Sequence, residues 1–136
     1  MLKLGLTIGL LLVGTSTTFA QGDVVAGEAL FGQRCQVCHL IGEGATNKVG
    51  PQLNGVVGAT VARLPDYSYS PALIKANAGD RIWTVTDLRR YMFLPKKLFP
   101  GTKMTFWGQR DPVQLSDLVA YLQSFAADGT RIEPAP

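Results

Sequence analysis

The apolar positions of the chain recur with a helical period most clearly near the C-terminus. The residues spaced three and four apart in this segment are Leu115, Leu118, Val119, Leu122 and Phe125. Because a helical turn takes about 3.6 residues, this spacing places them on one face of a helix. Asp111 can cap that helix, Pro112 suits its first position, and Gln114 completes a capping-box pattern. We therefore expect an amphipathic helix that begins after Asp111.

Two shorter helices are predicted from their first and last residues. Asp23 can cap a helix that carries Phe31 toward the core. Ser70 followed by Pro71 is typical of a helix start, and Gly79 can end that helix. These residues thus predict one helix after Asp23 and a second one near the middle of the chain, between Ser70 and Gly79.

A fourth helix and a long loop complete the expected architecture. Thr86 can open a helix that continues until Pro95 stops it, and its apolar residues are Leu88, Tyr91 and Met92. Residues 40–69 are rich in Gly and Pro, which predicts an ordered loop wrapped around something. Strand alternation is nowhere sustained. We expect an all-α fold of about four to five helices, with longer loops than an ordinary bundle needs.

The N-terminal segment has the features of a secretory signal. Lys3 precedes an apolar run over residues 4–13, and Thr18-Phe19-Ala20 suits cleavage beside a small residue. The run is too short to span a bilayer comfortably. We expect residues 1–20 to be a cleaved signal peptide and residues 21–136 to be one exported domain. A retained N-terminal anchor is the alternative.

The net charge of the chain gives no support to nucleic acid as a partner. The chain has 13 Lys and Arg against 10 Asp and Glu, and loss of Lys3 with the signal leaves 12 against 10. The resulting net charge of about +2 is too small to argue for nucleic acid. Charge can therefore matter only through its distribution over the surface.

Both cysteines and the only histidine of the chain lie within five residues, as Cys35, Cys38 and His39. A structural zinc site needs about four ligands, and no second pair of Cys or His is present. A thioredoxin-like dithiol normally accompanies a βαβ unit, and neither it nor a plain disulfide explains the histidine. Cys-x-x-Cys-His is the attachment pattern of a c-type haem, with the thiols adding to the vinyl groups and the imidazole binding iron. The sequence favours covalent haem.

The sixth iron position has two methionine candidates after removal of the signal. Met92 shares an apolar helix turn with Leu88 and Tyr91, which is typical of a core residue. Met104 lies in the Pro-Gly segment "FPGTKMTF", where a core residue is less expected. Met104 is therefore the preferred candidate. An open sixth position, as in a haem enzyme or gas sensor, is the competing possibility.

The chain resembles the class I cytochromes c, especially the bacterial cytochrome c2 and mitochondrial cytochrome c branch. The resemblance covers nearly all of the chain after the signal. The segments that carry it are "GDVVAGEALFGQRCQVCH", "GPQLNGVVG", "YSYS", Trp83, "LPKKLFPGTKMTF" and "DLVAYL". It implies the class I cytochrome c fold and one covalently attached haem c per chain.

The resemblance also implies a role for individual residues. The implied thioether anchors are Cys35 and Cys38, and the implied axial ligands are His39 and Met104. The Pro51 carbonyl is implied to accept the proton of the His39 ring, which fixes the ring and raises its basicity as a ligand. Tyr91 is similar to the family's tyrosine beside the methionine sulfur. The positions that match propionate partners are Tyr69, Trp83 and Thr102, and those that match the contact between the first and last helices are Gly27, Phe31, Leu118 and Tyr121.

Two departures from the family pattern concern the inner propionate. Ala59 stands where the family has an arginine, and a few extra residues separate Tyr69 from Trp83. Arg63 is a candidate to supply the missing charge. Gly27 is also expected at a close helix contact, because glycine in a helix costs about 1 kcal/mol relative to alanine and a close approach of another helix would explain it.

The function expected from these features is one-electron transfer by a soluble periplasmic carrier. The expected partners are protein redox partners such as a cytochrome bc1 complex, a terminal oxidase, a photosynthetic reaction centre or a periplasmic dehydrogenase, met in transient contact by a monomer. Alternatives are a dedicated subunit of one dehydrogenase complex and a haem enzyme or sensor. The residues expected to form a positive docking ring around the haem edge are Arg34, Lys48, Lys96, Lys97 and Lys103.

Overall fold

A computed structural model describes residues 22–132 and contains five helices there. These are α1 (Val24–Arg34), α2 (Pro71–Ala78), α3 (Val85–Phe93), α4 (Pro95–Leu98) and α5 (Pro112–Gln123). Strand pairing within residues 22–132 is limited to two isolated bridges, Thr60 with Ile82 and Phe125 with Arg131. The all-α prediction is confirmed. The predicted signal peptide lies outside the described residues.

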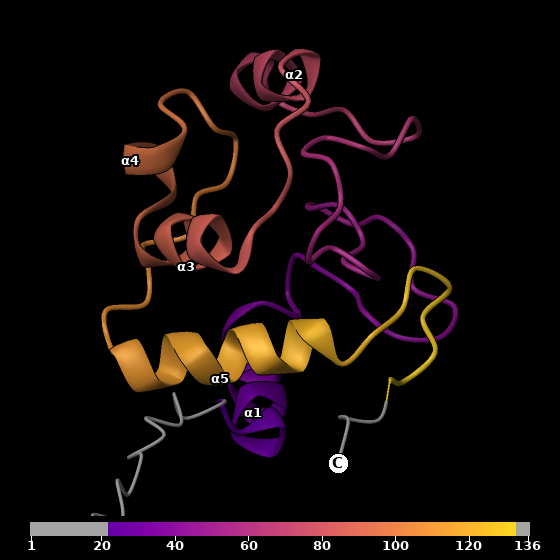
Figure 1. Cartoon of the computed structure of the whole chain (residues 1–136), viewed down its shortest axis with the longest axis vertical. Helices are drawn as coiled ribbons and strands as arrows, with labels where there is room; N and C mark the ends of the chain where they lie inside the picture. Colours follow the sequence, from indigo (N-terminus) through magenta and orange to yellow (C-terminus); the bar gives the residue numbers. More distant parts are fainter. Residues whose placement is uncertain (1–21, 133–136) are drawn as a thin grey trace, which may run out of the picture.

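Helices α1 and α5 cross near one end of the molecule, with α3 and α4 to one side and α2 at the far end (Figure 1). The crossing is close at Gly27, where an added Cβ would lie 2.0 Å from the backbone oxygen of Asp117. Next to it the rings of Phe31 and Tyr121 are 5.3 Å apart between centroids. The prediction that Gly27 faces the last helix is confirmed, and glycine is needed because no side chain fits.

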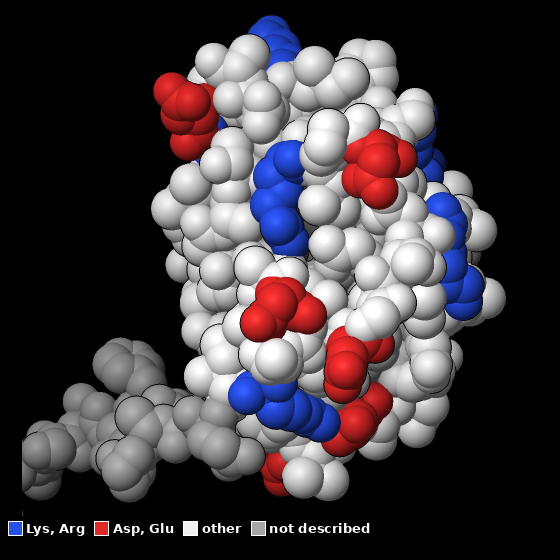
Figure 2. All heavy atoms as spheres, turned by 90° about the vertical axis from the view of Figure 1, so that its right-hand side faces the viewer, with Lys and Arg blue, Asp and Glu red and all other residues white. Residues whose placement is uncertain are grey.

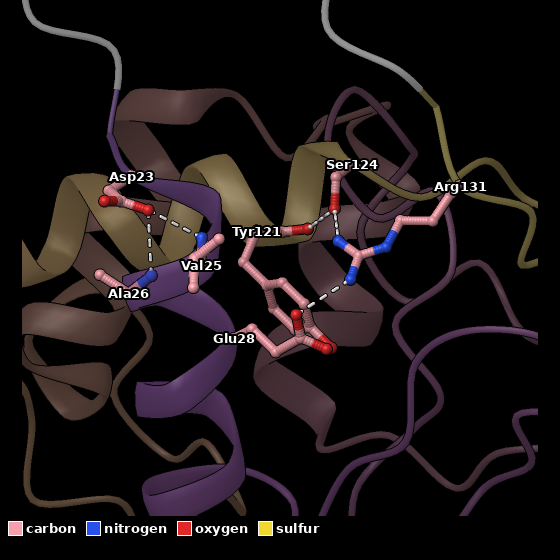
Figure 3. Close-up of polar contacts among 7 residues, drawn as sticks. All are labelled: Asp23, Val25, Ala26, Glu28, Tyr121, Ser124 and Arg131. Carbon is pink, nitrogen blue, oxygen red and sulfur yellow. Dashed lines mark hydrogen bonds and ion pairs between the residues drawn. The ribbon is translucent and has the colours of Figure 1, made fainter.

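Three predicted N-caps are confirmed. The Asp23 carboxylate accepts hydrogen bonds from the backbone N–H groups of Val25 and Ala26, at 2.8 and 3.1 Å (Figure 3). The Asp111 carboxylate does the same at the start of α5. Ser70 caps α2, which ends at Gly79 as expected. Each cap satisfies donors that the first turn of a helix leaves without a partner.

The predicted start of α3 is wrong by two residues. The helix begins at Val85, and its cap is Thr84, whose hydroxyl accepts from the N–H of Asp87 at 3.0 Å. Thr84 takes this role because Asp87 then lies in the first turn, where a negative charge suits the helix dipole. Asp87 also pairs with Arg81 at 2.9 Å. Pro95 ends α3 as predicted but also opens the short helix α4.

The predicted capping box of α5 is replaced by a relay. Gln114 does not bond the N–H of Asp111; that group donates to the side-chain oxygen of Gln109 at 3.0 Å. The amide nitrogen of Gln109 in turn donates to Gln114 at 2.6 Å. Gln109 is buried, and its own N–H donates to the carbonyl of Met92 at 2.9 Å. The segment before α5 is thereby fastened to the end of α3.

Residues 40–69 form the long loop that the sequence predicts. Asn54 is buried in it and makes two hydrogen bonds with the backbone of Gly42, at 2.7 and 2.9 Å. The Tyr67 hydroxyl donates to the carbonyl of Val49 at 2.6 Å. Side-chain hydrogen bonds therefore hold this loop in place of the backbone pairing found in helices and sheets.

Seen from the side of these loops, positive and negative side chains are interspersed (Figure 2).

No helix within residues 22–132 combines the length and the apolar character needed to cross a membrane.

Candidate functional site

A cavity of about 660 Å³ lies between the long loops and the inner faces of the helices. Its volume falls in the usual range for ligand pockets, about 300–1,000 Å³. The wall is predominantly apolar. Its charged lining residues are the cations Arg34, Arg63 and Lys103, with no Asp or Glu among them. Such a site suits a large apolar molecule that carries negative groups.

The Cys-x-x-Cys-His segment continues α1 by one turn and faces this cavity. The N–H groups of Cys38 and His39 both donate to the carbonyl of Cys35, at 3.0 and 2.9 Å. This turn brings both sulfur atoms and the imidazole to the cavity lining. The two cysteines are not joined by a disulfide. The arrangement matches the prediction that the three side chains act on one ligand.

The environment of Cys35 is unlike that of a redox-active thiol. Burial raises the pKa of its thiol to about 11, and the charge of Arg34 offsets this only in part. Redox-active Cys-x-x-Cys motifs instead have a thiol whose pKa is lowered. Within residues 22–132, no group of three or more His, Cys, Asp or Glu side chains is placed to hold a metal ion. The geometry therefore does not favour the dithiol or zinc alternatives.

The ring of His39 is held in one orientation. Its Nδ1 lies 2.8 Å from the carbonyl oxygen of Pro51, and because a carbonyl only accepts, Nδ1 carries the proton. Gly50 packs against the ring so closely that an added Cβ would lie 2.3 Å from Cε1. Burial lowers the pKa of His39, although the bond to Pro51 opposes this. The imidazole is thus neutral, with Nε2 available as a metal ligand.

Both candidate methionines line the cavity. Met92 comes from α3, is 8% exposed and belongs to the core, as expected. Met104 comes from the segment between α4 and α5, is half-buried, and its N–H donates to the Thr102 hydroxyl at 3.3 Å. That hydroxyl lies 2.5 Å from the hydroxyl of Tyr91. Tyr91 and Thr102 thus tie α3 to the segment that carries Met104.

The other predicted cofactor contacts also lie in the cavity wall. The predicted residues that line it are Cys35, Cys38, His39, Pro51, Tyr69, Trp83, Tyr91, Thr102 and Met104. Trp83 is buried and packs against Tyr91 and Phe99, with centroids 5.0 and 5.7 Å apart. The structure brings all nine together from stretches spread between residues 35 and 104. Their individual roles toward a cofactor stay predictions.

The structure shows where a positive charge enters the wall near Ala59. Ala59 is not among the lining residues, whereas Arg63 is, and its guanidinium donates to the carbonyl of Asn54. Burial raises the pKa of Tyr69, and the charge of Arg63 opposes part of this increase. Arg63 thus adds a positive charge to the cavity wall, and its role toward a propionate stays a prediction.

Of the five predicted docking residues, two are among those that line the cavity. Arg34 and Lys103 line the cavity, and the ammonium group of Lys48 donates to the carbonyl of Gln36 beside the cysteines, at 2.8 Å. Lys96 and Lys97 belong to α4 and do not line the cavity. Lys97 lies in a separate hollow with residues of α3 and α5. The role of all five residues in docking stays a prediction.

The lining residues that the sequence analysis did not single out include Tyr67, Val37, Val49 and Trp107. Tyr67 packs on Tyr69 at 4.8 Å between centroids, and its presence in "YSYS" was the available signal. Val37, Val49 and Trp107 line the cavity although they are mostly exposed. Nothing in the sequence pattern distinguishes these three from ordinary surface residues.

Comparison with known proteins gives a consistent result. The cytochrome c family model matches residues 24–126. The chain belongs to the cytochrome c family. A cytochrome c2 from Agrobacterium tumefaciens (strain II Chrys) is 52% identical over 102 residues, which are 75% of this chain and 91% of the relative. A cytochrome c-550 from Ancylobacter novellus is 44% identical over 98 residues, 72% of this chain and 92% of the relative.

The fold comparison supports the same family. The solved structure of cytochrome cH from Methylobacterium extorquens has a TM-score of 0.66 and 42% sequence identity, and the match covers 75% of this chain and 98% of that one. The chain is thus a class I c-type cytochrome with an all-α fold. Cytochromes c are electron carriers, and this is the function that family membership gives the chain.

The cavity fits the family's cofactor, one covalently attached haem c. Its apolar wall suits the macrocycle, and its three cations suit the two carboxylates that every haem carries. Cys35 and Cys38 are unpaired thiols in the lining. His39 has one nitrogen bound to Pro51 and the other available. The chemistry of the donors therefore agrees with the family assignment.

Proposed function

We propose that this cytochrome c is a soluble periplasmic carrier whose haem iron is ligated by His39 and Met104. The single observation that carries the proposal is the 2.8 Å contact between His39 Nδ1 and the Pro51 carbonyl, in a cavity that Met104 also lines. When bound, the haem supplies a one-electron Fe(III)/Fe(II) couple. The residues of the chain hold the iron ligands in place and keep water away from them.

The chain's residues hold the ligands and exclude water. Pro51 and Gly50 fix the imidazole, and the buried pair Tyr91 and Thr102 positions the segment of Met104. The aromatic wall around Trp83 keeps this part of the cavity apolar. Fixed ligands and little water reduce the rearrangement that accompanies a change of charge, which favours fast electron transfer.

Met104 is preferred over Met92 as the second ligand because Met92 is a core residue of α3. We expect Met104→Ala to abolish the far-red absorption band of the ferric protein and to admit added ligands such as carbon monoxide. Met92→Leu, which preserves volume, should keep the band. The reverse pattern would assign the ligand to Met92, and a wild-type protein without the band would indicate an open sixth position.

Export to the periplasm is proposed from the N-terminal segment, because residues 1–20 have a signal-like pattern. Intact-mass measurement of the protein from its native host should give a chain that begins at Gln21 and is increased by one haem. A mass that includes residues 1–20 would indicate a retained anchor instead. The same experiment reports the number of haems per chain.

The proposed partners are acidic redox proteins, which would meet the predicted positive ring of Arg34, Lys48, Lys96, Lys97 and Lys103. In support, Arg34 and Lys103 line the cavity, and Lys48 donates to the Gln36 carbonyl beside the cysteines. A positive rim around the cofactor would raise the rate of encounter with an acidic partner more than its affinity. The candidate partners are a bc1-type complex, a terminal oxidase, a photosynthetic reaction centre and a periplasmic dehydrogenase.

A further inference from the structure

The chain continues past α5 in a tight turn that packs on the long loop. The N–H of Ala126 donates to the carbonyl of Thr130 at 2.9 Å, and the N–H of Gly129 donates to the carbonyl of Ala126 at 3.0 Å. The Asp128 carboxylate accepts from the N–H and the hydroxyl of Thr130, at 2.9 and 2.8 Å. We name residues 126–131 the C-terminal turn. The match to the cytochrome c family model ends at residue 126, so the family model assigns this turn no role.

Gly129 holds the turn against two residues of the long loop. It is buried, and its φ of +88° lies in the left-handed region that favours glycine. An added Cβ would lie 2.7 Å from the carbonyl carbon of Gly42 and 2.8 Å from the side-chain nitrogen of Asn54. An added Cβ on Gly55 would in turn lie 2.8 Å from the Cα of Ala127. The turn and the loop, far apart in the sequence, therefore lie side by side (Figure 1).

Asn54 connects this contact to the cavity. Its side chain is 5% exposed and bonds both the N–H and the carbonyl of Gly42, at 2.7 and 2.9 Å. Its backbone carbonyl accepts a hydrogen bond from the guanidinium of Arg63, which lines the cavity. No residue of the C-terminal turn lines the cavity itself. An effect of the turn on the cavity must therefore pass through the loop.

The charge of Arg63 is available to a molecule in the cavity. The ion pairs found within residues 22–132 join Arg81 to Asp87 and Arg131 to Glu28, and neither involves Arg63. No Asp or Glu lines the cavity. A positive charge fixed in an apolar wall favours the ferrous state of a haem, which carries one positive charge fewer than the ferric state. The reduction potential thus depends on where this guanidinium is held.

We propose that the C-terminal turn is a positioning element for Arg63, in which Gly129 and Asn54 hold the guanidinium where it raises the reduction potential of the haem. This deepens the proposed function as a one-electron carrier and rests on it. A hydrogen bond to a backbone carbonyl fixes a long side chain that otherwise samples many rotamers and extends its charge into water. When the turn is loosened, Asn54 shifts and the charge of Arg63 moves away from the cavity.

The test is a spectroelectrochemical titration of the purified protein with its haem. Arg63→Gln should lower the ratio of ferrous to ferric protein at a fixed ambient potential about ten-fold, which is about 59 mV for a one-electron couple. Gly129→Ala should lower the ratio about three-fold, because its Cβ displaces Asn54. Adding Gly129→Ala to Arg63→Gln should change the ratio no further, since both substitutions act through the same charge.

Gly44→Ala is the matched control for Gly129→Ala. Gly44 lies in the same long loop with φ +71°, but an added Cβ there meets nothing within 4 Å. This variant carries a similar backbone strain and should leave the ratio unchanged. If Gly129→Ala does not fold, Thr130→Gly replaces it, because it loosens the exposed turn without adding bulk or changing charge. Thr130→Gly should lower the ratio about two-fold, and only when Arg63 is present.

The two variants at glycine also separate positioning from stability. Denaturant unfolding should show a loss for both Gly129→Ala and Gly44→Ala, whereas only Gly129→Ala should change the ratio. The proposal is overturned by an unchanged ratio in Arg63→Gln, by an unchanged ratio in the variant of the turn, or by a shift that is equal with and without Arg63. Each of these results is a measured potential and does not depend on a protein partner.

Failure of the proposed function is read from the wild type alone. A wild-type protein without a reversible one-electron titration, or without the far-red band of the ferric state, loses the proposed function and this inference with it. A wild-type protein that titrates reversibly and shows the band, but whose variants in the turn keep its ratio, retains the proposed function and loses only the role of the turn.

Discussion

The crossing of α1 and α5 and the loop wall of the cavity are held together in different ways. At the crossing, protein packs on protein: the backbone of Gly27 contacts the backbone of Asp117, and Phe31 packs on Tyr121. The loop wall over residues 40–69 instead faces a cavity of about 660 Å³. The crossing is therefore packed mainly by the protein itself, although Phe31 also lines the cavity, whereas the loop wall depends on the cofactor for its packing.

The hydrogen bonds of the two regions show the same contrast. Helices α1 and α5 satisfy their own backbone groups and need side chains mainly at their caps. In the loop wall, side chains such as Asn54 and Tyr67 bond the backbone over distances of twelve and more residues along the chain. These bonds fix single points and do not fill space. We expect the loop wall to lose order first when the cavity is not filled.

The largest effect is expected from removing the haem attachment. The variant Cys35→Ser with Cys38→Ser should leave the cavity unfilled. Unfilled cavities cost about 24 cal/mol per Å³, so a void of this size would exceed the usual stability of about 5–15 kcal/mol. We expect loss of cooperative thermal unfolding in circular dichroism. Amide exchange should show more residual protection in α1 and α5 than in residues 40–69.

A haem-free variant that unfolds at the wild-type temperature would contradict this dependence. The single variant Cys35→Ser is the control, because one thioether bond then remains possible through Cys38. It should retain haem and most of the stability. Equal protection of the two regions in the double variant would show that the contrast between them is wrong.

The second-largest loss of stability is expected from a substitution at the crossing of α1 and α5. Gly27→Ala would place a Cβ 2.0 Å from the Asp117 oxygen and 2.8 Å from the Cβ of Tyr121, so the helices must separate. We expect a loss of about 2–4 kcal/mol in the free energy of unfolding, measured with denaturant, because overpacking and lost contacts add. Gly32→Ala on the same helix meets only the end of the Gln36 side chain, at 3.6 Å.

Gly32→Ala should therefore be neutral or stabilise the protein by up to about 1 kcal/mol, through its better helix propensity. The opposite signs of the two substitutions isolate the close approach from the general cost of glycine in a helix. A loss below about 0.5 kcal/mol for Gly27→Ala would show that the crossing is more adaptable than its geometry indicates.

The sequence predicts the crossing better than the loop wall, for a physical reason. Caps at Asp23, Ser70 and Asp111 are local, since each bonds groups two or three residues away. The relay through Gln109 was missed because its partners include the end of α3, far along the chain. The cap of α3 at Thr84 was missed, since the sequence analysis named Thr86 and could not use the contact of Asp87 with Arg81.

The candidate site shows the same division between local and distant information. Cys35, Cys38 and His39 were recognised from their spacing, and the family resemblance added residues such as Pro51 and Met104. The hollow that Lys97 shares with residues of α3 and α5 could not be read in this way, because it depends on how separate segments fold together. The exposure of Trp107 likewise depends on how the segment after Met104 is fastened, which no periodicity records.

The smallest loss of stability is expected where Arg131 contacts α1 and the end of α5. Arg131 pairs with Glu28 of α1 at 3.1 Å and donates to the Ser124 hydroxyl at 2.9 Å (Figure 3). Its guanidinium carbon also lies 5.3 Å from the ring centre of Tyr121 and 4.6 Å from that of Phe125. The ion pair is partly exposed, so its share is about 0–1 kcal/mol, whereas the aromatic contacts are less exposed to screening.

Two substitutions separate these contributions. Glu28→Gln removes the ion pair alone and should change the free energy of unfolding by less than about 0.5 kcal/mol, and less still at high salt. Arg131→Ala also removes the hydrogen bond and the contacts over two rings, so a loss of about 1–2 kcal/mol is expected that salt hardly changes. Denaturant unfolding of both variants at low and high salt measures the difference. If Glu28→Gln costs as much as Arg131→Ala, the ion pair is what fastens residues 124–131 to α1, and the aromatic contacts contribute little.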